Sequence, residues 1–356
     1  MITRLTIRVN YTHMLDLEVL MIMEKINISN TSMEASRIGL GTWAIGGWMW
    51  GGTDEKQSID TIHKALDHGI NFIDTAPAYG FGHSEELVGK AVKEYGNRED
   101  ILLATKVGIE WKEDQAFRNA SKERIHQEVE DSLRRLQTDY IDVYQVHWPD
   151  PMTPIHETAE ALNYLYKQGK IRAIGVSNFS PEQMDTFREA APLHTLQPPY
   201  NLFERDIESK TLPYVQEHDL TSITYGSLCR GLLSGKMTAD REFKGDDLRN
   251  NDPKFQQPRF KQYLDAVHEL DQLAKDRFGK NVLHLALRWV LDQPGSGIAL
   301  MGGRRPDQLD PVQEVSHFEI DQETLQDIDE ILLKHVKDPV GPEFMAPPDR
   351  QELGMK

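Results

Sequence analysis

The chain has 356 residues, of which 39% are hydrophobic and 27% are charged, a composition typical of a globular protein that buries a large core. Its formal net charge of −17 argues against nucleic acid or an anionic membrane as a partner, because both require a basic surface. The single cysteine, Cys229, excludes an internal disulfide and is typical of a reducing compartment, so we expect a cytoplasmic protein.

Residues 1–22 do not share the pattern of the rest of the chain, and we expect them to be a disordered extension or not native. The most hydrophobic piece, Leu15 to Met23, contains Asp16 and Glu18 and lacks a small-residue cleavage site, which disfavours a signal peptide. No apolar run in the sequence reaches the length that a membrane span needs. We therefore expect no membrane partner.

The segment from Met23 to Ser36 predicts a β-hairpin ahead of the main domain. Two short runs, Glu24–Ile28 and Met33–Ser36, are separated by the polar turn Ser29–Ser32. We expect this hairpin to plug the N-terminal end of a barrel.

From Arg37 onward, apolar runs of strand length alternate with amphipathic segments of helical length. The expected strands are Ile38–Thr42, Ile70–Asp74, Ile101–Lys106, Ile141–His147, Ile171–Ser177, Thr195–Gln197, Ser222–Tyr225 and Ile298–Met301. The clearest helical segments are Ser58–Asp67, Lys122–Leu136, Pro154–Lys167, Asp206–Glu217 and Val282–Leu291. Most of these strands are continuous apolar runs and do not alternate between apolar and polar residues, which is the pattern of strands covered on both faces. Eight strand-then-helix units predict an α/β fold, a (β/α)8 TIM barrel.

A doubly wound sheet is the competing fold, and one motif favours it. Residues Gly39 to Ala44 read GLGTWA, which matches the dinucleotide-binding fingerprint G-x-G-x-x-A. The residues that follow, IGGWMWGG, form a glycine- and tryptophan-rich loop where that fold requires the start of a helix. We therefore prefer the barrel.

Two long polar segments fall outside the alternating pattern. Thr238–Gln262 is rich in Asp, Asn and Pro, and an excursion of this length is usually a functional loop or disordered. The segment after Asp338 contains four prolines, and we expect it to wrap the surface. The sequence thus predicts one barrel domain over residues 23–338, with long loops at its C-terminal face, and a tail over residues 339–356. Whether Thr238–Gln262 closes over a ligand stays open.

Four polar side chains fall where consecutive barrel strands end. Asp74 ends the second strand and Tyr79 follows in its loop, whereas Lys106 ends the third strand and His147 the fourth. Because the C-terminal ends of barrel strands meet on one face, we expect the four to lie together. Each alone has an ordinary structural explanation, such as a turn cap or a solvated charge. Their convergence favours a catalytic site.

These residue types together can protonate a developing alkoxide. We expect Lys106, beside the phenol, to lower the pKa of Tyr79 and make it a better acid. Asp74 would pair with Lys106, and a neutral His147 would hydrogen-bond a substrate oxygen. No set of His, Cys and carboxylate residues has metal-ligand spacing, so we expect no metal.

Several runs in the chain, in this order, resemble the aldo-keto reductase family: GINFIDTAPAYG, LLATKVG, YQVHWPD, IRAIGVSNFS and YGSLCRGLLSGKM. The resemblance covers Glu24 to Leu333 and is greatest to bacterial NADPH-dependent reductases related to general stress proteins and potassium-channel β subunits. It implies NADPH-dependent reduction of a small aldehyde or ketone, with Tyr79 as the proton donor.

The resemblance also implies cofactor-binding positions. The nicotinamide carboxamide would lie against Ser177, Asn178 and Gln197, with Tyr225 stacked on the ring. Glycines, backbone N–H groups and cations after the seventh and eighth strands suit phosphates, and two arginines, Arg304 and Arg305, offer charge for a ribose 2′-phosphate, which favours NADPH over NADH. The implied set is Thr42, Trp43, Asp74, Ser177, Asn178, Gln197, Tyr225, Gly226, Ser227, Leu228, Arg230, Gly231, Lys236, Gly302, Gly303, Arg304 and Gln308.

Tryptophans in the loops after the strands are candidate walls of a substrate pocket. They are Trp43, Trp48, Trp111 and Trp148. An aromatic pocket with few charges would accept small aldehydes, including short sugars. The chain departs from the family at Met301, where a proline is usual, and at Val312, where an asparagine usually contacts the adenine. The adenine contacts are therefore left open.

Two other functions stay open from the residues alone. Lys106 could attack a substrate carbonyl, as the Schiff-base lysine of a barrel lyase or aldolase does. The chain could also be an NADPH-binding regulatory subunit with slow turnover, as the channel β subunits suggest. The sequence sets neither the substrate nor the direction, and we expect a monomer or a weak homo-oligomer.

Overall fold

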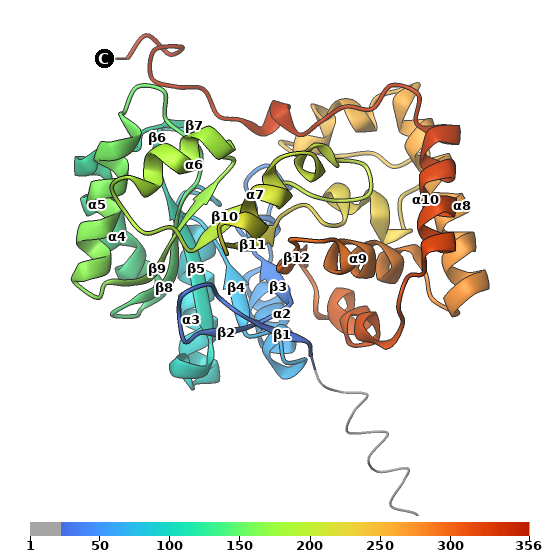
Figure 1. Cartoon of the computed structure of the whole chain (residues 1–356), viewed down its shortest axis with the longest axis horizontal. Coiled ribbons are helices and arrows are strands. Elements are labelled where there is room, and N and C mark those ends of the chain that lie inside the picture. The colour runs from blue at the N-terminus through green and yellow to red at the C-terminus, as the bar shows by residue number, and fades with distance from the viewer. Residues whose placement is uncertain (1–22, 356) are drawn as a thin grey trace, which may run out of the picture.

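The computed structural model describes residues 23–355, so the predicted extension over residues 1–22 lies outside the described residues. A closed barrel of eight parallel strands forms its centre, and β12 pairs with β3 to complete the cylinder (Figure 1). The strands are β3 (Ile38–Gly41), β4 (Phe72–Asp74), β5 (Leu102–Val107), β8 (Ile141–Val146), β9 (Ile171–Ser177), β10 (Thr195–Gln197), β11 (Thr221–Thr224) and β12 (Ile298–Gly302). The predicted (β/α)8 barrel is confirmed, and each predicted strand lies within two residues of its expected bounds.

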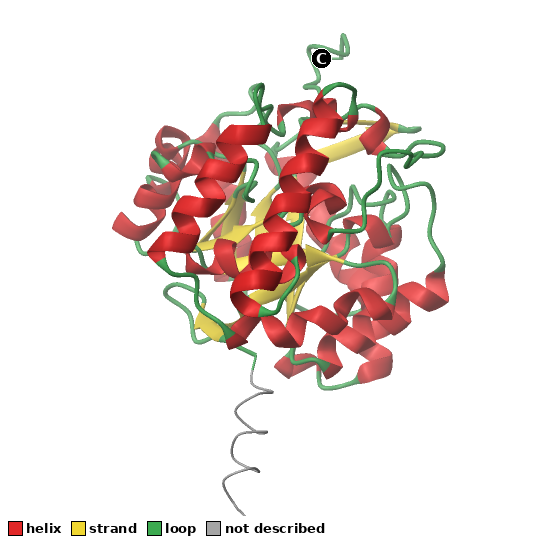
Figure 2. Ribbon diagram, turned by 90° about the vertical axis from the view of Figure 1, so that its right-hand side faces the viewer, coloured by secondary structure: helices red, strands yellow, loops and turns green. Residues whose placement is uncertain are grey.

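Helices surround the barrel and cover the outer face of its strands (Figure 2). They are α2 (Glu55–Asp67), α3 (His83–Tyr95), α4 (Lys122–Leu136), α5 (Ile155–Lys167), α6 (Pro181–Arg188), α7 (Thr211–Glu217), α8 (Arg259–Phe278), α9 (Val282–Asp292) and α10 (Gln322–His335). The single helix predicted over Asp206–Glu217 is wrong, because the 3-10 turn η3 (Asp206–Glu208) precedes α7. Pro213 lies in the first turn of α7 and has no N–H with which to continue a helix from upstream. Among residues 23–355, none of the helices is long and apolar enough to cross a bilayer.

The predicted hairpin closes the N-terminal end of the barrel. Strands β1 (Lys25–Asn27) and β2 (Glu34–Ser36) pair antiparallel and lie at the end of the barrel opposite the C-terminus in Figure 1. Ile28, Met33 and Ala35 are buried against side chains of the barrel interior. The apolar faces of the hairpin and of the barrel interior thus form one core, which seals this end from water.

The opposite, C-terminal face carries the long connections. A second hairpin, β6 (Ile109–Lys112) and β7 (Gln115–Arg118), lies between β5 and α4, and α8 lies within the connection from β11 to β12. After α10 the tail runs along the top of the molecule in Figure 1. The N–H of Arg118 donates to the carbonyl oxygen of Pro348, and Arg350 pairs with Asp150 at 3.0 Å. These contacts hold the end of the tail against the β6–β7 hairpin and the loop after β8.

Replacing Ile28 with alanine should lower the free energy of unfolding by about 2–4 kcal/mol, because it removes buried methyl groups from the plug and leaves a cavity. Ile28 is fully buried, whereas Leu333 is 74% exposed. Leu333→Ala is therefore the control, expected to change stability by less than about 0.5 kcal/mol. Urea titration measures both, and equal stability of the two variants would contradict the role given to the plug.

Candidate active site

Lys106 lies at the centre of the candidate site. It is fully buried in β5, and its ammonium nitrogen lies 2.5 Å from Asp74 Oδ1, 3.0 Å from the carbonyl oxygen of Thr75 and 3.1 Å from the Tyr79 hydroxyl. An ammonium has three hydrogens and no lone pair, so Lys106 donates in all three contacts. The phenol oxygen therefore accepts from Lys106, and the hydrogen of Tyr79 is left for a group in the cavity that Tyr79 lines.

The loop after β4 brings Tyr79 to this ammonium because a glycine allows the chain to turn closely against its neighbour. Gly80 has a φ of +69°, and a Cβ atom there would lie 2.2 Å from the carbonyl oxygen of Gly46. The positive φ of Gly80 and its close approach to Gly46 both exclude a side chain at this position. The ring of Trp43 stacks on that of Tyr79, with centroids 5.9 Å apart and 22° between the planes. The direction of the phenol is thus fixed from two sides.

Asp74 accepts hydrogen bonds from three barrel strands. Lys106 donates to Oδ1, while Gln145 of β8 and Gln197 of β10 donate to Oδ2 at 3.2 and 2.8 Å. Burial lowers the pKa of Lys106 below its ordinary value, and the charge of Asp74 acts in the opposite direction. Both oxygens of Asp74 thus have hydrogen-bond donors, and its proximity favours the ammonium form of Lys106.

The pKa of Tyr79 differs from the expectation based on the sequence. Burial raises this pKa well above its ordinary value, and the negative charge of Asp74 raises it further. The prediction of a lowered pKa for Tyr79 is therefore wrong, because loss of hydration and the charge of Asp74 both raise it. Tyr79 is a protonated phenol at neutral pH, and hence a hydrogen-bond donor.

His147 follows β8 and faces the Tyr79 ring edge-on, with centroids 5.7 Å apart. Burial, and then the positive charge of Lys106, lower the pKa of His147 well below its ordinary value. The direction agrees with the expectation of a neutral histidine. A neutral imidazole can donate one hydrogen bond to an oxygen in the cavity without adding a charge.

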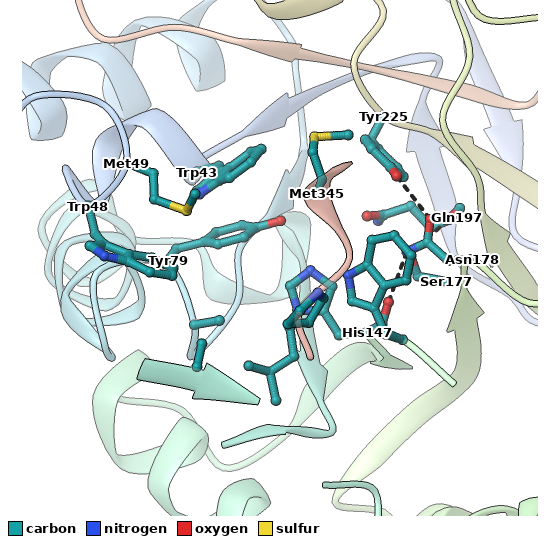
Figure 3. Close-up of a pocket in the computed structure, with 15 residues that line it drawn as sticks. Trp43, Trp48, Met49, Tyr79, His147, Ser177, Asn178, Gln197, Tyr225 and Met345 are labelled. Carbon is teal, nitrogen blue, oxygen red and sulfur yellow. Dashed lines mark hydrogen bonds between the residues drawn. The ribbon is translucent and has the colours of Figure 1, made fainter. Parts of the chain in front are cut away.

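A small cavity of about 100 Å³ lies beside Tyr79 and His147 (Figure 3). The predicted nicotinamide contacts and three of the predicted tryptophans line it, namely Ser177, Asn178, Gln197, Tyr225, Trp43, Trp48 and Trp148. Polar groups thus gather on one side, and aromatic rings form much of the other (Figure 3). Such a division is typical of pockets that orient a small ligand by a few polar contacts.

Trp111 does not line this cavity, contrary to the prediction. Its ring packs instead against Phe81, with centroids 5.6 Å apart, and against the guanidinium of Arg124. Sequence reasoning missed several residues that do line the cavity: Met49, Ile109, Ala116, Met345 and Pro347. They come from the loop after β3, the β6–β7 hairpin and the tail. No local pattern links these segments to the strand ends, so only the fold reveals them.

A larger cavity of about 780 Å³ adjoins the small one and forms a groove. The two cavities share Trp43, Tyr79, Tyr225 and Met345. The groove is lined by the remaining predicted cofactor positions: Thr42, Asp74, Gly226, Ser227, Leu228, Arg230, Gly231, Lys236, Gly302, Gly303, Arg304 and Gln308. It can therefore hold an extended ligand whose end reaches the Tyr79 hydroxyl.

Arg230 lines the groove but does not provide the free cation that the sequence suggested. Its buried guanidinium lies 2.5 Å from Glu204 Oε1 and 2.6 Å from Asp252 Oδ2. Lys254, which is also buried, lies 2.8 Å from the same oxygen of Glu204. Two cations and two carboxylates thus compensate one another. This cluster joins three loops rather than attracting an anion.

Three of the other cations in the groove form no ion pair within residues 23–355. Arg249 and Arg305 each pair with a nearby aspartate, whereas in the described part of the chain no ion pair involves Lys236, Arg241 or Arg304. These three side chains give the groove a positive field that suits an anionic ligand.

The turn after β12 offers fewer free backbone N–H groups to an anion than the sequence suggested. The segment Pro306–His317 is a 3-10 helix, η7, with a proline inside it. The side-chain oxygen of Gln308 accepts from the backbone N–H groups of Arg304 and Arg305, at 2.8 and 3.1 Å. These two N–H groups are therefore already used. The guanidinium of Arg304 remains as the part of this turn that suits an anion.

The polar excursion after Met237 is hydrogen-bonded to the loop after β3, and both segments line the groove. Asp246 accepts hydrogen bonds from the backbone N–H groups of Met49 and Gly51, at 2.7 and 3.1 Å. The N–H of Leu248 donates to the carbonyl oxygen of Met49 at 2.9 Å. Two segments of the groove wall are thus fixed to one another.

Comparisons with known proteins identify the class of protein. The model of the aldo/keto reductase family matches residues 37–333. The chain belongs to this family, whose members act on carbonyl groups with nicotinamide cofactors.

The relatives and solved structures give the particular neighbours. Aldo-keto reductase YhdN of Bacillus subtilis is 65% identical over 331 residues, covering 93% of this chain and all of the relative. The NADH-specific methylglyoxal reductase of Escherichia coli is 38% identical and covers 81% of this chain and 91% of its own length. The structure of the glycerol dehydrogenase AKR11B4 from Gluconobacter oxydans shares 54% identity with a TM-score of 0.82, covering 90% of this chain and 99% of the other.

The groove fits a nicotinamide cofactor in its chemistry. Ser227 is fully buried in the groove wall, and its hydroxyl has no hydrogen-bond partner among residues 23–355. Gly226 and Gly231 on either side have φ values of +71° and +95°, so this turn has no Cβ atoms at two positions where a ligand can come close. The uncompensated cations of the groove suit the phosphates.

Replacing Asp246 with alanine should raise the dissociation rate of the nicotinamide cofactor by about tenfold, because it removes two charge-assisted hydrogen bonds that join the excursion to the loop after β3. Stopped-flow fluorescence of the bound reduced cofactor measures this rate. Asp240→Ala is the control, since Asp240 lies exposed on the same excursion. Equal dissociation rates in the two variants would show that these contacts do not hold the cofactor.

Proposed function

We propose that this protein is an NADPH-dependent reductase of small aldehydes and ketones in the cytoplasm, with Tyr79 as the proton donor. The observation that carries this proposal is the 3.1 Å contact from the Lys106 ammonium to the Tyr79 hydroxyl, beside a cavity that adjoins the cofactor groove. The bound cofactor supplies a hydride to the carbonyl carbon. Every other part of the reaction falls to side chains of this chain.

Tyr79 provides the proton that the carbonyl oxygen needs. Its raised pKa keeps it protonated until an alkoxide, a stronger base, develops next to it. When the O–H bond of Tyr79 breaks, the ammonium of Lys106 already donates to the phenol oxygen and stabilises the phenolate. Solvent then returns a proton to the phenolate. Neutral His147 orients the carbonyl by donating a hydrogen bond to its oxygen.

The Schiff-base alternative is disfavoured by the surroundings of Lys106. A lysine that attacks a carbonyl needs a neutral amine with an accessible lone pair. Lys106 is fully buried, is paired with Asp74, and directs all three of its hydrogens to protein oxygens. Its environment therefore supports the role of a charge beside Tyr79.

The preference for NADPH rests on Arg304. This residue lines the groove, and its guanidinium donates to the carbonyl oxygens of Trp50 and Gly52 while forming no ion pair among residues 23–355. Burial and then the neighbouring Arg249 lower the pKa of Arg304, so a further anion placed between them would be stabilised. A ribose 2′-phosphate supplies that anion, although the relative from Escherichia coli is named as NADH-specific.

Replacing Tyr79 with phenylalanine should lower kcat for aldehyde reduction by about 10²–10⁴-fold, because the ring is kept and only the proton donor is lost. Cofactor oxidation followed at the absorbance of reduced nicotinamide, against a panel of aldehydes and ketones, measures this. Tyr95→Phe, at a 40% exposed surface position, serves as the matched control. A Tyr79 variant as active as the parent protein would end the assignment.

Replacing Arg304 with alanine should lower the ratio of kcat/KM with NADPH to that with NADH by about tenfold, since one charge-assisted contact to the 2′-phosphate is lost. The substitution also removes the hydrogen bonds to the carbonyl oxygens of Trp50 and Gly52. A loss of activity from that cause affects both cofactors equally and does not change the ratio. Arg277→Ala is the control, because Arg277 pairs with Glu323 and Asp327 at the surface and lines neither cavity. An unchanged ratio in the Arg304 variant would reject Arg304 as the phosphate contact.

A further inference from the structure

The hydroxyl of Tyr225 makes a contact that ring stacking does not require. It lies 2.9 Å from Oδ1 of Asn178, on the side of the small cavity that also contains Ser177 and Gln197 (Figure 3). The nitrogen of the same Asn178 side chain lies 3.0 Å from the carbonyl oxygen of His147 and 3.0 Å from Ser177 Oγ. One amide thus connects Tyr225 with the main chain of a residue at the reacting end of the site.

Chemistry alone fixes which way this amide points. A backbone carbonyl can only accept, so the atom of Asn178 that contacts the carbonyl of His147 must be Nδ2. Oδ1 is therefore the atom that faces Tyr225, and the Tyr225 hydroxyl must be the donor. Burial raises the pKa of Tyr225 well above its ordinary value, so the hydroxyl keeps its hydrogen at any physiological pH.

The main chains on both sides of this contact are held in place. The N–H of Tyr225 donates to the carbonyl oxygen of Pro198, and the carbonyl oxygen of Tyr225 accepts from the N–H of Tyr200, both at 3.0 Å. At the other end, the N–H of His147 donates to the carbonyl oxygen of Val107 at 2.8 Å. Asn178 itself has a φ of +62°, an unusual conformation that needs support from its surroundings.

We propose that Tyr225 acts through its hydroxyl as a positioning residue, which fixes the amide of Asn178 and through it the Ser177 hydroxyl and the main chain at His147. This inference rests on the proposed function. Both hydrogens of the Asn178 amide are directed away from Tyr225, one to the carbonyl oxygen of His147 and one to Ser177 Oγ, so the orientation of this amide holds both groups in place. Without the hydroxyl, Oδ1 of Asn178 is left unpaired beside an aromatic ring, and the amide can rotate.

Tyr225→Phe keeps the ring and removes only the hydroxyl, so it separates the two roles of this side chain. We expect kcat to fall by about tenfold, as for a buried hydrogen bond lost at one partner. The NADPH dissociation constant should change much less, because the groove contacts to the phosphates remain. The isotope effect with NADPH deuterated at the transferred position should rise, since hydride transfer becomes slower relative to product release.

A double-mutant cycle tests whether the hydroxyl acts through Asn178. The variants are Tyr225→Phe, Asn178→Ala and both together, with Tyr200→Phe as the matched control, because the Tyr200 hydroxyl contacts Glu208 and lies outside both cavities. If the proposal holds, the double variant has the same kcat and isotope effect as Asn178→Ala alone. Melting temperatures show that each variant is folded.

Two outcomes overturn the inference while the proposed function stands. The first is a Tyr225→Phe variant with the kcat and isotope effect of the parent protein. The second is independent, multiplicative losses in the double variant, which would mean that the hydroxyl does not act through Asn178. Absence of turnover by the parent protein with every aldehyde and ketone of the panel would instead overturn the proposed function.

Discussion

A buried ammonium constrains this protein more than any other single group. The charge of Lys106 is fully removed from water, and an uncompensated ion in such a place costs several kcal/mol. The carboxylate of Asp74, a backbone carbonyl and the phenol oxygen of Tyr79 take its three hydrogens. Gln145 and Gln197 satisfy the second oxygen of that carboxylate. Strands from around the barrel therefore meet at one ion pair, and the contacts that offset its burial also direct the phenol.

The charges on the C-terminal face fall into two arrangements with different consequences. Around Arg230 and Lys254, cations and carboxylates are equal in number and buried, so they join the loops after β10 and β11 to the polar excursion. Along the groove, Lys236, Arg241 and Arg304 form no ion pairs in residues 23–355 and leave a positive field. The compensated charges hold loops in place, whereas the cations without an ion pair attract an anionic ligand.

Proteins of this family carry names that point to different substrates. The relatives include proteins named as a methylglyoxal reductase and a glycerol dehydrogenase, on the same fold. In this chain the cavity wall is completed by Met49, Ile109, Met345 and Pro347, which all lie on connections or on the tail. Such segments tolerate change because they lie at the surface of a rigid barrel. Substrate choice can therefore change while the reacting groups remain in place.

The sequence by itself determined the barrel, its plug and the convergence of four polar side chains at the strand ends. Strand and helix periodicity is local, and parallel strands in a barrel all end on one face, so Asp74, Lys106 and His147 could be placed together without coordinates. Only the tertiary structure decided the direction of the pKa shift of Tyr79, the compensation of Arg230 and the absence of Trp111 from the cavity wall. These three features depend on burial and on neighbours from distant segments of the chain, and a local sequence pattern contains no information on either.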